Sequence, residues 1–271
     1  LGRVQDGVLQ IEELYRFANH TVEHGGHLCW DMDNLYAQVI EGLRKCAERG
    51  VCPATVGIDT WGVDFILLDA QNIPLGDVVA YRDKRTQGMD TLLESTFPPE
   101  TLYRHTGIAK QPFNTLYQLM AAFQEHPEYR ERAARMLFVP EYLSFLLTGK
   151  LANEYTNAST SALLNAKTAQ WDPAVVAAAG LPPALFRHSP VPAGSLLGSF
   201  RADVAARLGF SSQVILPATH DTGSAFIAIP ARDADAVFLS SGTWSLLGTE
   251  LLHPLCDEAS RVAGFTNEGG Y

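Results

Sequence analysis

The chain has 271 residues, enough for one large domain or two small ones. Hydrophobic residues make up 46% and charged residues 18%, which is typical of a soluble globular protein and excludes a largely disordered or fibrous one. The net charge is −10, so the summed field repels phosphate backbones and anionic membrane surfaces. We therefore expect neither nucleic acid nor a membrane as a partner, whereas a local pocket for a small anion is compatible with this charge.

Three absences in the sequence favour a cytoplasmic location. No apolar run reaches the roughly 18 residues of a membrane span, because Pro140 and Glu141 interrupt the longest one, residues 136–147. The first residues form neither a basic nor an apolar segment of a secretory signal. The four cysteines include no CxxC pair, which fits buried thiols in a reducing compartment.

The N-terminal part of the sequence alternates strand and helix signals, which predicts an α/β fold. The turn Gln5-Asp6-Gly7 separates two short arms, and apolar residues recur at helical spacing after Asp31, a plausible N-cap. Two later runs rich in β-branched residues flank Trp61-Gly62. The predicted elements are a hairpin with arms at 1–4 and 8–17, a helix from Asp31 to Gly50, and strands at 54–60 and 63–68.

The middle of the chain, residues 86–189, carries mostly helix signals and is predicted to be a helical insertion. Strand signals return after a Pro-rich passage, and Pro230 marks a break. We predict two domains, residues 1–230 and 231–271. The elements expected here are helices at 116–124, 128–134 and 142–147, a strand at 213–218, a helix from Asp221 to Ile229, a strand at 236–239, a turn at 240–243 and a strand at 244–250.

Several common catalytic motifs are absent from the sequence. It contains no GxxxxGK[ST] loop, no GxGxxG after a strand, no GxSxG elbow and no HExxH. P-loop ATPases, Rossmann dehydrogenases, α/β-hydrolases and zincins are therefore disfavoured. His24 and His27 flank two glycines, and a flexible turn explains this pattern better than a metal pair, so no metal ligand is predicted.

Asp221 is the first candidate for chemistry, because it follows a predicted buried strand and opens a predicted helix. Backbone N–H groups and the helix dipole favour an ionised carboxylate at that position, and such a carboxylate can accept a proton. An N-cap role, worth about 1 kcal/mol to the helix, explains the same residue. Both interpretations remain open at this point.

Three further segments each allow a functional and a structural interpretation. The small residues 240–243 could cup a phosphate with backbone N–H groups, or form a plain hairpin turn. Trp61 and Gly62 suit a sugar that stacks and hydrogen-bonds, or a buried tryptophan at a β-bulge. The charged run from Tyr81 to Arg85 is typical of a solvated turn with a local ion pair.

Taken in order, eight short segments of the sequence resemble the FGGY family of carbohydrate kinases. The resemblance covers practically the whole chain and implies an actin-like, ribonuclease-H-like fold with two lobes and a cleft between them. It also implies that residues 1–230 are the sugar-binding lobe and that residues 231–271 begin the nucleotide-binding lobe. The segments are GIDTWGVDF (57–65), AYRD (80–83), PFNTLYQL (112–119), LTGK (147–150), EYTNA (154–158), HDT (220–222), SSGTWS (240–245) and TNEGG (266–270).

The resemblance assigns roles to individual residues. It implies that Asp221 is the catalytic base and that His220, Thr222, Gly62, Trp61 and Tyr81 line the sugar site. It implies that Thr243 and Gly242 face the phosphates of ATP, which binds with Mg²⁺. The expected reaction is phosphorylation of a ketose at its C1 hydroxyl, with L-rhamnulose as the expected substrate of rhamnose catabolism and L-fuculose as a related deoxy-ketose. An ionised aspartate suits the removal of the hydroxyl proton as the phosphoryl group is transferred.

Two alternatives stand beside this assignment. The family begins with an Asp-x-Gly-x-x-x-Gly-Arg phosphate loop and continues into a full second lobe, and we expect both to lie outside residues 1–271. A sugar-binding lobe without phosphoryl transfer is therefore the first alternative. A hydrolase that uses Asp221 and Asp64 as a carboxylate pair is the second. The sequence leaves the oligomeric state open.

Overall fold

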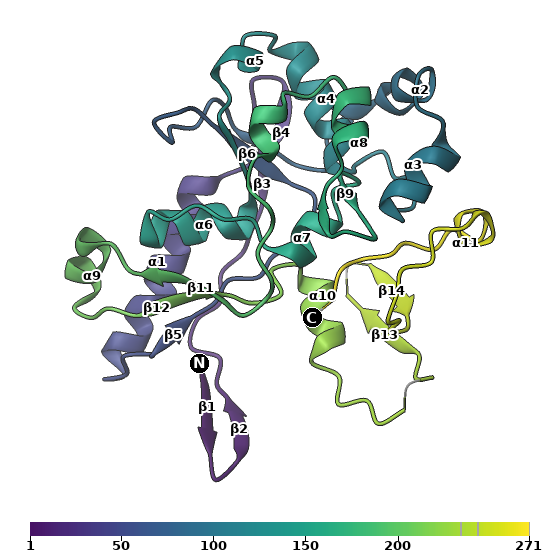
Figure 1. The fold of residues 1–271 in the computed structure, drawn as a ribbon. Helices are drawn as coiled ribbons and strands as arrows, with labels where there is room; N and C mark the ends of the chain where they lie inside the picture. The colour runs from purple at the N-terminus through teal and green to yellow at the C-terminus, as the bar shows by residue number, and fades with distance from the viewer. Residues whose placement is uncertain (234, 243, 271) are drawn as a thin grey trace.

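Short helices and short strands alternate along the chain in the computed structural model, which describes residues 1–233, 235–242 and 244–270 (Figure 1). The helices are α1 (Met32–Glu48), α2 (Met89–Glu94), α3 (Pro99–Thr106), α4 (Thr115–Glu125), α5 (Tyr129–Arg132), α6 (Val139–Thr148), α7 (Tyr155–Ser159), α8 (Pro173–Ala178), α9 (Ala202–Leu208), α10 (Asp221–Ile227) and α11 (Glu258–Val262), with 3₁₀ turns η1 (Lys84–Thr86) and η2 (Pro183–Phe186). The strands are β1 (Gly2–Gln5), β2 (Val8–Ile11), β3 (Thr21–His24), β4 (His27–Trp30), β5 (Thr55–Val56), β6 (Phe65–Leu68), β7 (Val78–Val79), β8 (Arg135–Phe138), β9 (Leu164–Asn165), β10 (Gln170–Trp171), β11 (Ser195–Ser199), β12 (Gln213–Leu216), β13 (Phe238–Ser241) and β14 (Ser245–Gly248).

Strand β6 is buried on both faces and separates two parts of the hydrophobic core. Successive side chains of a strand point to opposite faces, and Phe65 and Leu67 pack with the α2, α3, α4 and α8 side. Ile66 and Leu68 pack instead against α1, β7 and α6. Antiparallel pairing with β8 covers the β6 backbone. The continuous apolar run in the sequence is therefore explained by a strand with core on both sides.

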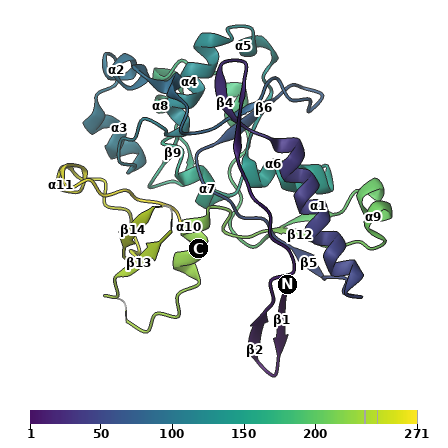
Figure 2. The same cartoon turned by 180° about the vertical axis from the view of Figure 1, so that it is seen from behind.

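Helix α1 forms as its sequence predicts and anchors a third part of the core. The Asp31 side chain accepts the Asn34 N–H at 2.9 Å, which is the predicted N-cap contact. Ile40 and Leu43 face residues of α9 and β12, and α1 and α9 lie beside the β11–β12–β5 sheet in both ribbon views (Figures 1 and 2). In that sheet β12 pairs antiparallel with β11 and parallel with β5.

Several predicted boundaries differ from the observed ones. The second arm of the first hairpin ends at Ile11 and not at residue 17, because pairing stops where the Glu12 N–H reaches the Leu1 carbonyl at 2.9 Å. The strand predicted at 54–60 is reduced to β5. Strand β8 was not predicted, since its buried run lies among helix signals. The helices expected in the middle of the chain are present as α4, α5 and α6.

Residues from α10 onward form a smaller group of elements beside the main body. Strands β13 and β14 pair antiparallel with Ser241 opposite Ser245, so the first part of the predicted small-residue turn belongs to a strand. The C-terminal end of the chain lies beside α10 in both views (Figures 1 and 2). The division at residue 230 stays a prediction.

None of the helices within the described ranges is long and apolar enough to cross a membrane.

Two fully buried glutamates meet at Thr219, directly before α10. Glu154 caps α7 by accepting the Thr156 N–H at 2.9 Å, and its Oε2 also accepts the Thr219 N–H at 2.9 Å. The Thr219 hydroxyl lies 2.8 Å from Glu141 Oε1 and 2.9 Å from Glu154 Oε2. A hydroxyl has one proton and cannot donate to both carboxylates. The contacts are satisfied when Glu141 is protonated and donates to Thr219, which donates to Glu154.

Burial raises the pKa of Glu141 from 4.5 to about 8, which fits a neutral carboxyl at neutral pH. A raised pKa in the folded state stabilises the protein most below the unfolded value and loses that stabilisation as pH rises. We therefore predict that the free energy of unfolding falls between pH 4.5 and about 8, on the order of a few kcal/mol. Glu141→Gln, a neutral substitute of equal size, should flatten this fall.

The measurement is urea unfolding at pH values from 5 to 8, for the unaltered chain, Glu141→Gln and Glu131→Gln. Glu131 is an exposed residue of α5 and serves as the control. The same pH slope in Glu141→Gln and in the unaltered chain would show that Glu141 is ionised in the fold.

Candidate active site

A cavity of about 440 Å³ lies between the main body and the elements that follow residue 220. Seven of the eight site residues predicted from the sequence line it, and Thr243 lies outside the described residues. These seven are Trp61, Gly62, Tyr81, His220, Asp221, Thr222 and Gly242. The lining also includes residues to which the sequence assigned no role, among them Phe113, Asn114, Thr160, Trp244 and Glu268.

Asp221 is placed at the cavity by the junction between β12 and α10. The Thr60 N–H donates to the Thr219 carbonyl at 3.0 Å, and the Asp221 N–H donates to the Thr60 carbonyl at 2.8 Å. These contacts join the segment after β5 to the end of the neighbouring parallel strand, so two chain segments meet at one edge of the sheet. Oδ1 of Asp221 accepts the Thr222 N–H at 2.7 Å, and the side chain stays 55% exposed. The carboxylate is therefore fixed and accessible.

The N-cap interpretation of Asp221 is wrong by one residue. His220 is the N-cap of α10, with an extended backbone, and Asp221 is the first helical residue. The Asp221 backbone N–H is already held by Thr60, which fixes the helical geometry from this residue onward. The Asp221 carboxylate still accepts the Thr222 N–H of the first turn at 2.7 Å, so it contacts the helix N-terminus from the first helical position.

His220 lies between two carboxylates. Its Nδ1 is 3.1 Å from Glu268 Oε2, and its Nε2 is 3.6 Å from Asp221 Oδ1. Burial by itself lowers the pKa of His220, but the charges of Glu268 and Asp221 outweigh burial and raise the pKa above its ordinary value. A protonated imidazole here forms an ion pair on each side, and neither pair has the geometry of a hydrogen bond.

Gly62 forms a tight point of the cavity wall. A Cβ at this position would lie 3.0 Å from Thr160 Oγ1 and 3.2 Å from His220 Cδ2. A side chain here would therefore push against two residues of the same wall. The following residue, Val63, has a positive φ of 69°, which makes the bend sharp. Glycine lets the backbone of the wall come close to a ligand.

Trp61 is oriented by a buried carboxylate behind it. Oδ2 of Asp64 accepts the Nε1–H of Trp30 at 2.7 Å and of Trp61 at 2.9 Å, and the two indole rings lie 4.2 Å apart. Burial raises the pKa of Asp64, and these donors together with Gln118 and the Tyr81 N–H oppose the shift. Asp64 is 1% exposed and does not line the cavity. The hydrolase alternative, which needs Asp64 and Asp221 to face each other, is therefore wrong.

Aromatic rings continue from Tyr81 across the cavity. The Tyr81 and Phe113 rings are 5.6 Å apart in an edge-on arrangement, and Phe113 lies 5.9 Å from Trp244. Trp244 belongs to the β13–β14 turn, so these rings connect the two walls. Phe113 and Trp244 both lie in segments that carry the family resemblance. That resemblance is the sequence signal that could have identified them as site residues.

The β13–β14 turn offers a phosphate fewer N–H groups than its small residues suggest. The Gly242 N–H is already used, because it donates to the Trp244 carbonyl at 2.8 Å. Ser240 and Gly242 nevertheless line the cavity opposite Gly62. The hydroxyl of Ser240 is the type of donor that a phosphate oxygen accepts, so this wall fits the phosphates of a nucleotide through side-chain donors.

Carboxylates near α10 are of the type that binds Mg²⁺. Burial raises the pKa of Asp59, and the negative charge of Asp221 adds to this shift. Mg²⁺ in phosphoryl-transfer sites binds one or two carboxylates together with substrate phosphates. Asp221 lines the cavity and is a carboxylate of this kind, whereas Asp59 does not line the cavity. The described part of the chain holds no cluster of three or more His, Cys, Asp or Glu side chains suited to a metal ion.

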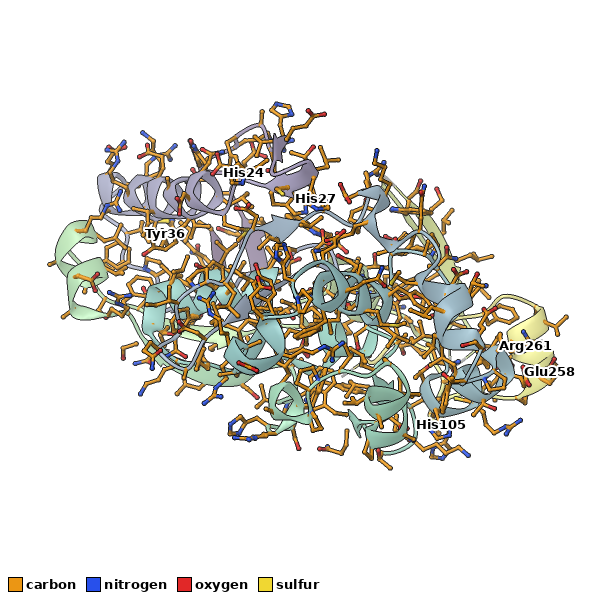
Figure 3. All side chains as sticks on the ribbon, turned by 90° about the horizontal axis from the view of Figure 1, so that it is seen from above. His24, His27, Tyr36, His105, Glu258 and Arg261 are labelled. Carbon is orange, nitrogen blue, oxygen red and sulfur yellow. The ribbon has the colours of Figure 1, made fainter. Side chains whose placement is uncertain are left out.

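His24 and His27 lie on the β3–β4 hairpin. Their hairpin lies on the main body (Figure 3), and they pair separately, His24 with Asp77 at 2.5 Å and His27 with Asp83 at 3.2 Å. The turn interpretation of the two glycines between them agrees with the β3–β4 hairpin.

Sequence comparison places this site within a known family. A model of the N-terminal domain of the FGGY family of carbohydrate kinases matches residues 5–228. A rhamnulokinase from Halalkalibacterium halodurans is 48% identical over 262 residues, which are 97% of this chain and 56% of that protein. A rhamnulokinase from Oceanobacillus iheyensis is 44% identical, with 99% of this chain and 57% of that protein covered.

Solved structures share the fold at lower identity. A ligand-bound xylulose kinase from Lactobacillus acidophilus gives a TM-score of 0.78 at 21% identity, over 90% of this chain and 50% of that one. Glycerol kinase from Plasmodium falciparum, solved with ADP, gives 0.72 at 17% identity, over 85% of this chain and 48% of that one. The chain thus has the mixed α/β fold of these sugar kinases and spans about half the length of the curated relatives it matches. It belongs to the FGGY family of carbohydrate kinases.

Proposed function

We propose that this chain carries the sugar site of a kinase that transfers a phosphoryl group from ATP to the C1 hydroxyl of a ketose. L-rhamnulose is the proposed substrate, with L-rhamnulose 1-phosphate as the product. The supporting observation is that Asp221, exposed and fixed at the β12–α10 junction, shares one cavity with His220, Gly62 and Trp61. The similarity to two rhamnulokinases supports the choice of sugar.

In this mechanism Asp221 accepts the proton of the C1 hydroxyl as the bond from that oxygen to the γ-phosphorus forms. The hydrogen bond from the Thr222 N–H keeps the carboxylate oriented. The His220 imidazolium donates to the sugar, and Trp61 and Tyr81 give the ketose an apolar face. Phosphoryl transfer depends mostly on positioning and charge stabilisation.

The proposed site for ATP is the cavity wall that contains Ser240 and Gly242. Ser240 and Gly242 lie where ATP phosphates would face the sugar, and Thr243 is proposed beside them by resemblance. Mg²⁺ bound with the ATP phosphates would neutralise charge on the transferring group. In this proposal residues 1–230 hold the sugar and residues 231–271 begin the nucleotide-binding lobe.

The test combines calorimetry with a coupled assay for ADP release. L-rhamnulose, L-fuculose and L-xylulose are titrated into the chain, alone and with MgATP. Tightest binding of L-rhamnulose is expected for residues 1–271, and ketose-dependent ADP release is expected for a protein that also has the phosphate loop and the full second lobe. Binding without ADP release in that longer protein would support the alternative of a sugar-binding lobe without phosphoryl transfer. Tighter binding of L-fuculose than of L-rhamnulose would make L-fuculose the proposed substrate. No binding of any ketose would overturn the proposed function.

In the intact enzyme, with the phosphate loop and the full second lobe, Asp221→Asn should lower ketose-dependent ADP release by about 10²- to 10⁴-fold, the usual contribution of a general base. The amide keeps the size of the side chain and cannot accept the proton, so the Kd for L-rhamnulose should change by less than about threefold. Asp203→Asn, on the exposed surface of α9, is the control. ADP release at the unaltered rate in Asp221→Asn would refute the assignment of the base.

Trp61 emission should change when L-rhamnulose binds and should not change with ATP alone, because the indole lines the proposed sugar side of the cavity. Trp61→Phe should remove most of the change. Trp171→Phe should leave it intact, since Trp171 packs in the core and donates to the His188 carbonyl. An unaltered emission change in Trp61→Phe would place the sugar elsewhere.

A further inference from the structure

The C-terminal segment 266–270, TNEGG, lies across the cavity and has no assigned role. The Asn267 N–H donates to the Gly107 carbonyl at 2.8 Å, and the Asn267 side-chain amide donates to Gly107 and Leu255 carbonyls, each at 2.9 Å. On the other side of Glu268, the Gly269 N–H donates to Ser159 Oγ at 2.7 Å. Both chain neighbours of Glu268 are therefore anchored, which fixes where its side chain begins.

The segment packs directly on α7. A Cβ at Gly269 would lie 2.6 Å from Cε1 of Tyr155 and 2.7 Å from its Cζ, so a larger residue would displace the chain from this helix. α7 is also the helix whose N-cap, Glu154, holds Thr219. The segment that carries Glu268 and the junction that carries Asp221 therefore rest on the same helix.

The Glu268 carboxylate points into the proposed sugar site. It lines the same cavity as Gly62 and Asp221, and its side chain is 29% exposed while Oε2 lies 3.1 Å from His220 Nδ1. A carboxylate in a partly enclosed site is a strong acceptor for hydroxyl groups, and a ketose offers several hydroxyls. The contact with His220 offsets part of the cost of burying the charge.

We propose that Glu268 is a sugar-binding residue, whose carboxylate accepts hydrogen bonds from ketose hydroxyls while His220 holds it in place. The inference rests on the proposed function and adds a residue from beyond residue 230 to the sugar site. Glu268 and Asp221 then contact the ketose from the two sides of His220.

The experiment measures the affinity for L-rhamnulose by calorimetry for Glu268→Gln, Glu268→Asp and the control Glu258→Gln. Glu258 pairs with Arg261 on α11 (Figure 3), and it does not line the cavity. Hydrogen bonds to charged groups predict a Kd about 10- to 100-fold higher for Glu268→Gln. Glu268→Asp keeps the charge on a shorter side chain and should lose less. Glu258→Gln should bind like the unaltered chain.

A second measurement reports the contact with His220 without any sugar. The acidic groups around His220 are Glu268, Asp221 and Glu154. The pKa of His220, followed by NMR of histidine-labelled chain, should fall in Glu268→Gln and stay unchanged in Glu258→Gln. Far-UV circular dichroism and urea unfolding show whether each variant is folded.

The outcomes separate the inference from the proposed function. Weakened binding of L-rhamnulose together with a lowered His220 pKa in folded Glu268→Gln supports the inference. Unaltered affinity in Glu268→Gln overturns it and leaves the proposed function standing. If Glu268→Gln does not fold, the affinity of Glu268→Asp decides, and a Kd equal to that of the unaltered chain overturns the inference. No binding by the unaltered chain overturns both.

Discussion

The position of Asp221 depends on how the fold satisfies two buried glutamates. A buried carboxylate is costly unless donors surround it, and Glu154 finds its donors in α7 and in Thr219. Glu141 contacts the same threonine from α6. Three elements that are distant in sequence are thus joined at the residue two places before Asp221, and Thr60 joins a fourth. These hydrogen bonds fix the residue at which α10 begins. The position of the exposed Asp221 carboxylate is therefore set by the buried side chains of Glu141, Glu154 and Thr219.

The acidic side chains of the cavity bear on which ligand each wall suits. Asp221 and Glu268 flank His220. Under the proposed function, a neutral ketose would meet strong acceptors here, which suits a ligand rich in hydroxyls. The phosphates of ATP would instead meet repulsion, since like charges at short range are unfavourable. In that proposal the acidic residues favour the sugar on this wall, and a nucleotide that faces it needs a divalent cation.

Local patterns were enough to predict the secondary structure that positions the site, because each signal acted over a few residues. The Asp31 cap, the Gly50 stop of α1 and the apolar run of β6 all required only neighbouring residues. The short extent of β5, the pairing of β8 and the change of cap from Asp221 to His220 depend on partners far away in sequence. Composition and spacing left Asp221 open between cap and base, and only the resemblance assigned its role. Glu268 belonged to a quoted segment, yet its contact with His220 follows from tertiary packing that no local pattern encodes.

The two walls of the cavity are joined by hydrogen bonds from the C-terminal segment and by an aromatic contact. Besides the anchored segment around Asn267, the rings of Phe113 and Trp244 meet across the cavity. A ketose held by Gly62 and Asp221 on one side and by Glu268 on the other would add hydrogen bonds between the walls. A ligand that binds only when both walls are in place stabilises that arrangement in proportion to the logarithm of its concentration over Kd. Under the proposed function, sugar binding would therefore stabilise the arrangement in which Gly62 and Gly242 line one cavity.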